Sequence, residues 1–363
     1  MSTVRCRARW LTAAVVAVWA VCLTTLAVLA SVLVEAPDVR VLVIDTDAGA
    51  DDAVAILELL RAEEMHIGRD WTGRRRETRV LAITCVFGNT GVENVTKNVL
   101  ATLETAGRQD VPVYTGAGVA LLPPKPTYDF YFGEDGFGDF LPPGPPDVNK
   151  VQPEHAAAAL VRLAREHKGQ LSLLCIGPLT NIALAVRLDA AFLDNLRDLF
   201  ILGGAAHGNG NYKPGAEFNM YSDPDAAMIV LDAVPTDKPA FLLSWETALD
   251  AELPVAWRRD VLGAAGTADV AFLNRAEGVL LATLPTWNSA DGLLAAHILD
   301  ARVCPPGKAV RVDVLSGQGP GRGVSLVDHS NTTRLPANAV LVEKPDVAAF
   351  QRLLLRLLGS KGS

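Results

Sequence analysis

Four aspartates lie within eight residues near the start of the chain, in the stretch VLVIDTDAGADDAVAIL at residues 41–57. Asp45 and Asp47 end an apolar run that predicts a buried strand, in which alternate residues share a face, while Asp51 and Asp52 open the helix predicted after it. A helix N-terminus favours negative charge by about 0.3–1 kcal/mol per exposed carboxylate, which accounts for one or two of the four. Four carboxylates together indicate a site for a hard cation such as Ca²⁺ or Mg²⁺. The alternative is that Asp51 and Asp52 act only as helix caps.

Short apolar runs alternate with helix-length amphipathic segments over most of the chain. Strands are expected at residues 40–45, 80–88, 111–116, 170–177, 196–204 and 238–245, and helices at 51–64, 92–107, 153–167, 178–188 and 223–234. This alternation predicts an α/β fold with an open, mostly parallel sheet and helices on both faces, forming a single domain over residues 37–363. In such sheets ligands bind beyond the carboxyl ends of the strands, where the aspartates fall.

The first 36 residues are expected to form a separate targeting segment. Arg5, Arg7 and Arg9 precede an uncharged apolar run at residues 10–34, and these 25 residues exceed the roughly 20 that cross a bilayer. A cleaved signal peptide and a retained signal anchor both fit this pattern. Either one predicts a secreted or membrane-anchored protein with an extracellular or lumenal catalytic domain, which would meet the membrane only through this segment.

The composition argues against one class of partner and allows a large hydrophobic core. The net charge of −8 argues against a nucleic-acid partner, because phosphate binding requires a basic surface. Half of the residues are hydrophobic, which is enough for a large core. Cys85, Cys175 and Cys304 have no metal-ligand spacing, and the first two fall in expected strands as buried thiols.

Five motifs in order along the chain resemble those of the inosine-uridine-preferring nucleoside hydrolases. DTDAGADDAVAI resembles the family's opening pattern D-x-D-x-G-x-D-D-A-x-A. It is followed by GNTGVENVTKN from Gly88, GPLTNIALA from Gly177, NYKPGAEFNMYSDPDAA from Asn211, and SADGLLAA, which contains Asp291. The resemblance covers residues 41–300. It implies hydrolysis of the N-glycosidic bond of ribonucleosides to ribose and free base, and a homo-oligomeric assembly.

The resemblance also implies a calcium site. Its ligands would be Asp47, Asp52, the backbone carbonyl of Ile176, and Asp291. A water on the ion would have a lowered pKa, and Asp47 would take its proton as the general base. Asp51 would bind the ribose hydroxyls.

A second group of polar residues is implied to hold the sugar. Asn211, Glu217 and Asn219 match positions that bind the ribose hydroxyls, and Glu217 and Asn219 are two apart in a segment expected to be extended. Asn219 would also lie near the anomeric carbon, where positive charge develops in the transition state. Asn89 would line the pocket near the reacting centre. The alternatives are a polar loop with a helix cap at Asp223 and an ordinary turn at Asn89.

The sequence departs from the family at the two positions where a histidine acts as the acid for the leaving base. Ala290 and Phe132 stand at these positions. A base that is protonated by solvent and stacked on an aromatic ring can still leave, which favours purines. Trp287 is the preferred stacking residue, and packing in the core or in a lid is the alternative for it and for the other aromatic candidates, Phe132, Phe137 and Trp245.

Two further functions remain open at this point. The D-x-D after the first strand also occurs in haloacid-dehalogenase-type phosphatases, which use Mg²⁺, although Asp51 and Asp52 would then have no role. A nucleoside- or sugar-binding relative without turnover is the other alternative, because both histidines are missing.

Overall fold

A computed structural model of the chain describes residues 19, 38–70, 72–122, 128, 130–140 and 146–360. The chain divides into two compact units, residues 1–38 and 39–363, and the following description concerns the second. The expected signal peptide or anchor at residues 1–36 lies outside the described residues except for Trp19. Within the described part of the chain, none of the helices has the length and apolar character needed to span a bilayer.

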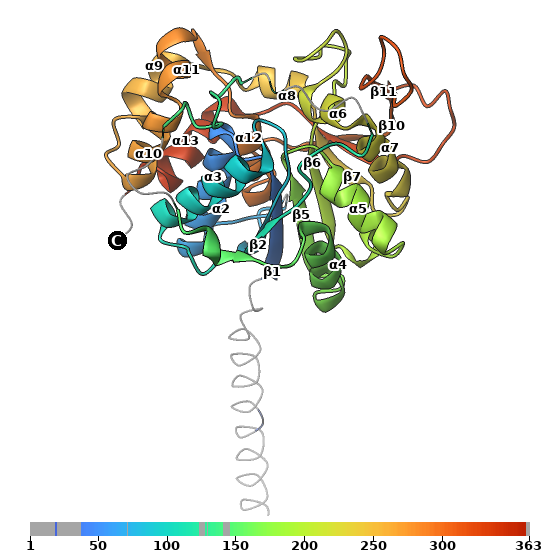
Figure 1. Cartoon of the computed structure of the whole chain (residues 1–363), viewed down its shortest axis with the longest axis horizontal. Helices are drawn as coiled ribbons and strands as arrows, with labels where there is room; N and C mark the ends of the chain where they lie inside the picture. The colour runs from blue at the N-terminus through green and yellow to red at the C-terminus, as the bar shows by residue number, and fades with distance from the viewer. Residues whose placement is uncertain are drawn as a thin grey trace, which may run out of the picture. The chain divides into compact units, whose positions relative to one another are not determined.

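Ten strands of the described residues form one sheet in the order β11-β10-β12-β7-β6-β5-β1-β2-β3-β4 (Figure 1). The pairs β1–β5, β5–β6, β6–β7, β7–β12, β2–β3 and β3–β4 are parallel, and β10 pairs antiparallel with β11 and β12. The open, mostly parallel sheet is therefore confirmed. The strands are β1 Asp38–Thr46, β2 Arg76–Cys85, β3 Val113–Thr115, β4 Val151–Gln152, β5 Leu171–Cys175, β6 Asp198–Leu202, β7 Ala240–Leu243, β10 Pro306–Val314, β11 Ser325–Asp328 and β12 Ala339–Val342.

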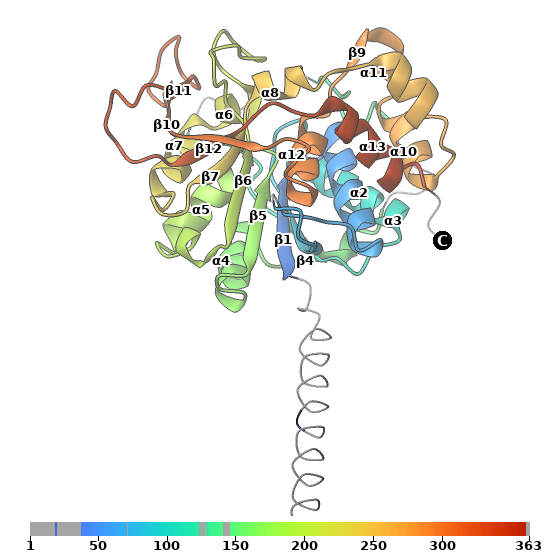
Figure 2. The same ribbon diagram turned by 180° about the vertical axis from the view of Figure 1, so that it is seen from behind.

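Helices cover both faces of the sheet because the side chains of its strands alternate between two buried clusters. Leu42 and Ile44 of β1 join the cluster under one helical layer, while Val43 joins the cluster under the other. Figures 1 and 2 show these two layers on opposite sides of the strands. The first layer contains α2 Ala50–Glu64, α3 Val92–Ala106, α12 Ala290–Leu299 and α13 Val347–Leu357, and the second contains α4 Ala156–Glu166, α5 Thr180–Leu188 and α7 Pro224–Ala233.

Shorter elements follow the carboxyl ends of β6 and β7 and continue up to α12. The strand expected at residues 238–245 ends at Leu243, and Trp245 begins a helix instead. The two short strands β8 and β9 pair antiparallel in a sheet of their own. These elements are α6 Phe218–Ser222, α8 Trp245–Asp250, β8 Leu253–Pro254, α9 Val255–Trp257, the π-helix Arg258–Leu262, α10 Ala268–Ala276, α11 Gly278–Thr283 and β9 Thr286–Trp287.

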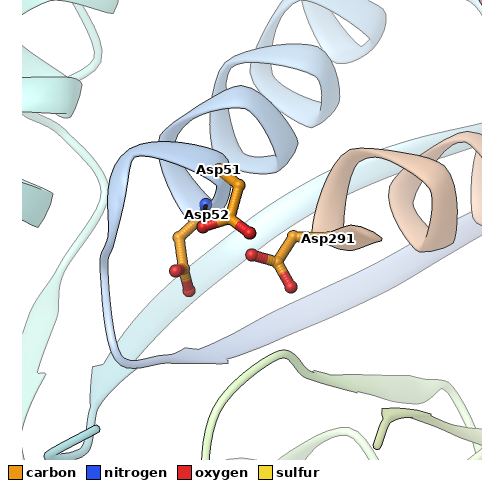
Figure 3. A group of neighbouring side chains, drawn as sticks. All are labelled: Asp51, Asp52 and Asp291. Atoms are coloured by element: carbon orange, nitrogen blue, oxygen red, sulfur yellow. Dashed lines mark hydrogen bonds between the residues drawn. The ribbon is translucent and has the colours of Figure 1, made fainter. Parts of the chain in front are cut away.

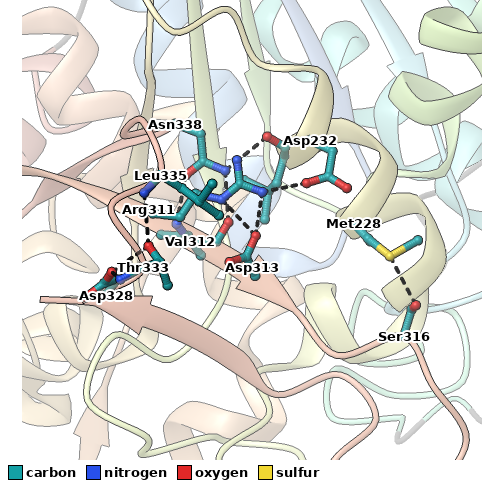
Figure 4. Close-up of polar contacts among 11 residues, drawn as sticks. Met228, Asp232, Arg311, Val312, Asp313, Ser316, Asp328, Thr333, Leu335 and Asn338 are labelled. Carbon is teal, nitrogen blue, oxygen red and sulfur yellow. Dashed lines mark hydrogen bonds and ion pairs between the residues drawn. The ribbon is translucent and has the colours of Figure 1, made fainter. Parts of the chain in front are cut away.

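The antiparallel edge of the sheet is fixed by buried and half-buried polar contacts (Figure 4). The Asn338 amide accepts a hydrogen bond from the Val312 nitrogen and donates one to the Val312 carbonyl, each at 2.8 Å. Arg311 donates to Asp232 of α7 at 2.6 Å, which joins β10 to the neighbouring helix. These contacts anchor the edge strands, for which the sequence analysis made no prediction.

Candidate active site

A cavity of about 390 Å³ lies beyond the carboxyl ends of the central strands. Most of the residues expected in the site line it, namely Asp47, Asp51, Asn89, Ile176, Asn211, Glu217, Asn219 and Asp291. Asp52 is fully buried among them, and Trp287 is the expected residue that lies elsewhere. The structure thus gathers into one site residues that are far apart in the sequence.

Three aspartates from two helix N-termini come together in this site. Asp51, Asp52 and Asp291 each offer a carboxylate oxygen, and these oxygens lie within 4.8 Å of one another (Figure 3). Asp51 and Asp52 stand in the first turn of α2, and Asp291 stands in the first turn of α12. The helices approach closely at Gly292, where an added Cβ would lie 3.1 Å from a methyl of Val54.

Asp52 is held in place by its neighbours in the turn between β1 and α2. Its carboxylate accepts hydrogen bonds from the Thr46 hydroxyl at 2.5 Å, the Gly49 nitrogen at 2.8 Å and the Asn89 amide at 3.2 Å. The bond from Gly49 caps the first turn of α2, so Asp52 has the expected capping role. It also remains in the acidic cluster, which the cap alone does not explain.

Asp47 lies in a tight space between two glycine-containing loops. Its Oδ2 accepts a hydrogen bond from the Asn89 nitrogen at 2.8 Å. An added Cβ at Gly88 would lie 1.9 Å from Oδ2, and one at Gly177 would lie 3.0 Å from Oδ1, so side chains there would displace the carboxylate. Asp47 Oδ1 and Asp291 Oδ1 are buried without a hydrogen-bond partner among the described residues.

Asp45 is separated from the other three aspartates. It accepts hydrogen bonds from the Thr84 hydroxyl at 2.6 Å and the Asn181 amide at 2.9 Å, and it does not line the cavity. The expectation that Asp45 and Asp47 share a face is not met, because β1 ends at Thr46 and the chain then turns through Ala48, whose φ is +25°. Burial raises the pKa of Asp45 to about 7.

The acidic cluster, which consists of Asp47, Asp51, Asp52 and Asp291, has the electrostatic properties of a cation site. Burial raises the pKa of Asp47, Asp51 and Asp291 well above its ordinary value, and repulsion between neighbouring carboxylates raises it further. Burial raises the pKa of Asp52 to about 6, against the hydrogen bonds that it accepts. Such a cluster must hold protons or a cation, and the two unpartnered oxygens fit a hard divalent ion. The carbonyl of Ile176, which also lines the cavity, adds a neutral oxygen.

The sugar-binding candidates lie around the start of α6 rather than in an extended segment. Glu217 caps this helix and accepts hydrogen bonds from the nitrogens of Asn219, Met220 and Gly204 at 2.8–3.0 Å. Burial raises the pKa of Glu217 to about 7. The Asn219 amide nitrogen donates to the Ile176 carbonyl at 3.3 Å, which joins α6 to the cluster of aspartates.

Asn211 belongs to the same arrangement. Its side-chain oxygen accepts a hydrogen bond from the nitrogen of Phe218, the first residue of α6, at 2.9 Å. The Gly-rich loop that contains Asn211 is therefore tied to the helix that carries Asn219. Asn211, Glu217 and Asn219 therefore line the same cavity as the aspartates, and their role in holding the ribose stays a prediction.

The comparisons with known proteins agree with this geometry. The sequence profile of the inosine-uridine preferring nucleoside hydrolases matches residues 42–352. The chain belongs to this family.

Relatives and solved structures give the same family. The chain is 39% identical over 190 residues to a probable uridine nucleosidase of Oryza sativa subsp. japonica, with 52% of this chain and 54% of that protein covered. It is 28% identical over 308 residues to the pyrimidine-specific ribonucleoside hydrolase RihB of Escherichia coli, with 82% and 90% covered. Its structure resembles an inosine-guanosine nucleoside hydrolase with a TM-score of 0.80 and 26% identity, covering 89% of this chain and 100% of that one. The chain spans about half the length of the plant uridine nucleosidases that it matches.

Trp287 occupies a different place from the one expected. It is 5% exposed, and its indole nitrogen donates a hydrogen bond to Glu277 at 2.6 Å. Arg258 donates to the other oxygen of Glu277 at 2.5 Å. Trp287 therefore belongs to a buried network behind the cavity wall and does not face the substrate space. The physical reason is strand alternation, because its neighbours Thr286 and Asn288 line the cavity and Trp287 points the other way.

The other aromatic candidates divide between the cavity and the core. Trp245 and Phe132 line the cavity, whereas Phe137 is buried against Phe272 with ring centres 5.6 Å apart. Ala290 also lines the cavity, so the missing histidine leaves a small apolar side chain there.

Sequence reasoning missed several residues of the cavity wall. These are Tyr131, Leu202, Tyr212, Phe218, Glu252, Leu284, Thr286 and Asn288. The even-numbered positions from Leu284 to Ala290 all face the cavity, so a period of two leading into the Asp291 motif was the signal available in the sequence. Among the described residues that line the cavity, none is a lysine, arginine or histidine.

Proposed function

We propose that this nucleoside hydrolase family member cleaves the N-glycosidic bond of ribonucleosides and releases ribose and the free base. The observation on which this proposal rests is the floor of the cavity, where Asp47 and Asp291 each have a buried oxygen without a partner beside the polar groups of Glu217 and Asn219. A ribose offers neighbouring hydroxyl donors to such acceptors, and a cation satisfies the remaining oxygens.

Calcium is the ion that we propose for this floor. Asp47, Asp52, Asp291 and the Ile176 carbonyl would hold it, and Asp51 offers a further carboxylate within 4.8 Å of Asp52 and Asp291. When bound, the ion would act as a Lewis acid, orient the ribose diol and lower the pKa of a water molecule. Oxygen-only ligands suit calcium or magnesium rather than a soft metal.

The side chains divide the remaining work of the reaction. Asp47 accepts the proton of the attacking water, because a bound cation beside it would keep this carboxylate ionised and able to act as a base. Asp51 and Glu217 accept hydrogen bonds from the ribose hydroxyls. The Asn219 nitrogen is held by two carbonyls, at Ile176 and Leu202, which leaves the amide oxygen to face the positive charge that develops on the sugar.

Departure of the base proceeds without a histidine acid in the cavity. The described lining offers no lysine, arginine or histidine, so we propose that the leaving base takes its proton from solvent. Trp245, Phe132 and Tyr131 provide aromatic surface against which a purine can stack, and purine preference remains part of the proposal. Uridine is the substrate that tests this preference, since several relatives are named uridine nucleosidases.

The charge of the cavity favours unphosphorylated substrates. Asp47, Asp51, Glu217, Glu252 and Asp291 line it, and the described lining has no cationic side chain to neutralise a phosphate. This observation argues against the phosphatase alternative, whose substrate is an anion. Measurement of base release distinguishes an enzyme from a non-catalytic nucleoside binder.

We also propose a secreted or membrane-anchored protein and a homo-oligomer. The first rests on the basic and apolar pattern of residues 5–34 and the second on family resemblance.

The decisive experiment measures release of free base from inosine, guanosine, uridine and cytidine by chromatography. The protein is assayed with calcium, after removal of metal by a chelator, and after calcium is restored. We expect cleavage that is lost with the chelator and regained with calcium. Binding of nucleosides without release of base would support the non-catalytic alternative, and full activity in chelator would contradict the calcium site.

A further inference from the structure

The two-stranded sheet β8–β9 forms part of the cavity wall above the acidic floor. Its register pairs Leu253 with Trp287 and Pro254 with Thr286, so the next antiparallel partners are Glu252 and Asn288. Leu253 and Trp287 are buried on one side of this sheet, at 2% and 5% exposure. Glu252 and Asn288 therefore point to the other side, and both line the cavity.

Asn288 places the pair Glu252 and Asn288 close to the acidic floor. Asn288 lies two residues before Ala290 and three before Asp291 of the floor. Two residues of extended chain span about 6.6 Å, so Asn288 lies within about that distance of Ala290 along the wall. A nucleoside whose sugar rests on the floor presents its base to this part of the wall.

The two side chains offer hydrogen-bond acceptors to the cavity. The Asn288 nitrogen donates to the Ala248 carbonyl at 3.1 Å, which ties β9 to α8 and leaves the amide oxygen as the free end of the group. Glu252 is exposed and makes no ion pair with the described residues, so its two carboxylate oxygens also remain available. An ionised carboxylate accepts hydrogen bonds and donates none.

We propose that Glu252, with Asn288 beside it, selects substrates by accepting hydrogen bonds from the amino and imino groups of the base. This inference rests on the proposed ribonucleoside hydrolysis. A carboxylate can receive two parallel N–H bonds from adjacent donors, as in the imino and amino groups of guanine. Hypoxanthine offers only the imino donor at this edge, so it can form one of these two bonds and not both.

The expected specificity is therefore a preference for guanine over hypoxanthine as the base. Guanosine should be cleaved more efficiently than inosine. A site built to pair with a donor rejects the analogue that lacks it, because the acceptor is then left without a partner.

The test compares Glu252→Gln with the wild-type protein. The variant keeps the shape of the side chain but replaces one acceptor by a donor. We expect the ratio of kcat/KM for guanosine over inosine to fall by about tenfold, the scale of a good bidentate contact. Asp250→Asn is the matched control: it removes a charge two residues away, from an exposed residue that does not line the cavity, and should leave this ratio unchanged.

The outcomes separate this inference from the proposed function. Wild-type cleavage with a guanosine-to-inosine ratio that stays within twofold in Glu252→Gln would overturn the inference alone, as would a wild-type preference for inosine. Calcium-loaded wild-type protein that cleaves none of the four nucleosides would overturn the proposed function, and the inference with it.

Discussion

The floor and the upper wall of the cavity are built in contrasting ways. The floor consists of buried carboxylates at the ends of β1 and the starts of α2 and α12, and neighbours hold Asp47 and Asp52 by hydrogen bonds. The upper wall consists of partly exposed residues on α8, β8 and β9, and Glu252 there has no ion-pair partner among the described residues. The proposed reaction chemistry therefore lies in the part of the fold with more hydrogen-bond constraints, and the proposed substrate choice lies in segments with fewer.

The strongest test of the floor is Asp47→Asn. Loss of the general base is expected to lower kcat by about 10²–10⁴-fold. The melting temperature should not fall, because the change removes a charge from a cluster in which the carboxylates repel one another. Steady-state kinetics and thermal unfolding measure the two effects. An unchanged kcat would mean that another residue is the general base. The floor would then not differ from the wall by carrying the reaction chemistry.

Substitution of two tryptophans distinguishes a residue of the hydrophobic core from a residue of the cavity wall. Trp287→Ala should destabilise the protein by about 3–5 kcal/mol, because it empties a buried site and removes the hydrogen bond to Glu277. Trp245→Ala should destabilise the protein less, because Trp245 is only partly buried against the core, and should lower kcat/KM by about tenfold, because Trp245 lines the cavity.

Denaturant unfolding and nucleoside kinetics, applied to both variants, would reveal the difference. The reverse pattern, with Trp287→Ala stable but impaired for purines, would restore Trp287 as the stacking residue.

Calcium binding is expected to stabilise the floor selectively. An ion at one hundred times its dissociation constant adds about 2.7 kcal/mol to the free energy of unfolding. Thermal unfolding with and without calcium measures this effect directly. Asp291→Asn should remove most of it, whereas Glu252→Gln on the wall should keep it. Equal calcium stabilisation in wild type and Asp291→Asn would contradict the assignment of the ligand.

The smallest expected effect is a pH dependence of the chelated protein. Burial raises the pKa of Glu217 from 4.5 to about 7, so the folded state keeps a proton that the unfolded chain releases in this window. The contribution of Glu217 is therefore fully present below about pH 4.5 and is lost as the pH rises to about 7. Melting temperatures between pH 5 and 8 should fall as pH rises, and Glu217→Gln should flatten this slope. If the slope is unchanged in the variant, other carboxyl groups cause the pH dependence.

The same contrast explains what could be predicted from the sequence. Asp47, Asp51 and Asp52 lie within six residues on one strand–turn–helix unit, so any fold that preserves this unit brings them together. The parallel sheet followed from the alternation of strands and helices. The antiparallel strands β10 and β11 and the elements between α8 and β9 did not, because they depend on pairings between short segments that are distant in sequence.

The wall was harder to predict because the face of a side chain there depends on one residue of register. Trp287 was the preferred stacking residue, yet β9 is two residues long and its pairing with β8 turns Trp287 into the core. Glu252 was not noticed at all, since a single glutamate after a short helix has no local signal for function.

The convergence of α2 and α12 has a consequence for how the protein matures. Each helix N-terminus carries a partial positive charge of roughly half a unit, so two such ends face Asp51, Asp52 and Asp291. Together with bound protons, they offset part of the repulsion in a newly synthesised chain. We therefore expect the polypeptide to finish folding before it binds the proposed ion, in contrast to small zinc modules that stay unfolded until metal arrives.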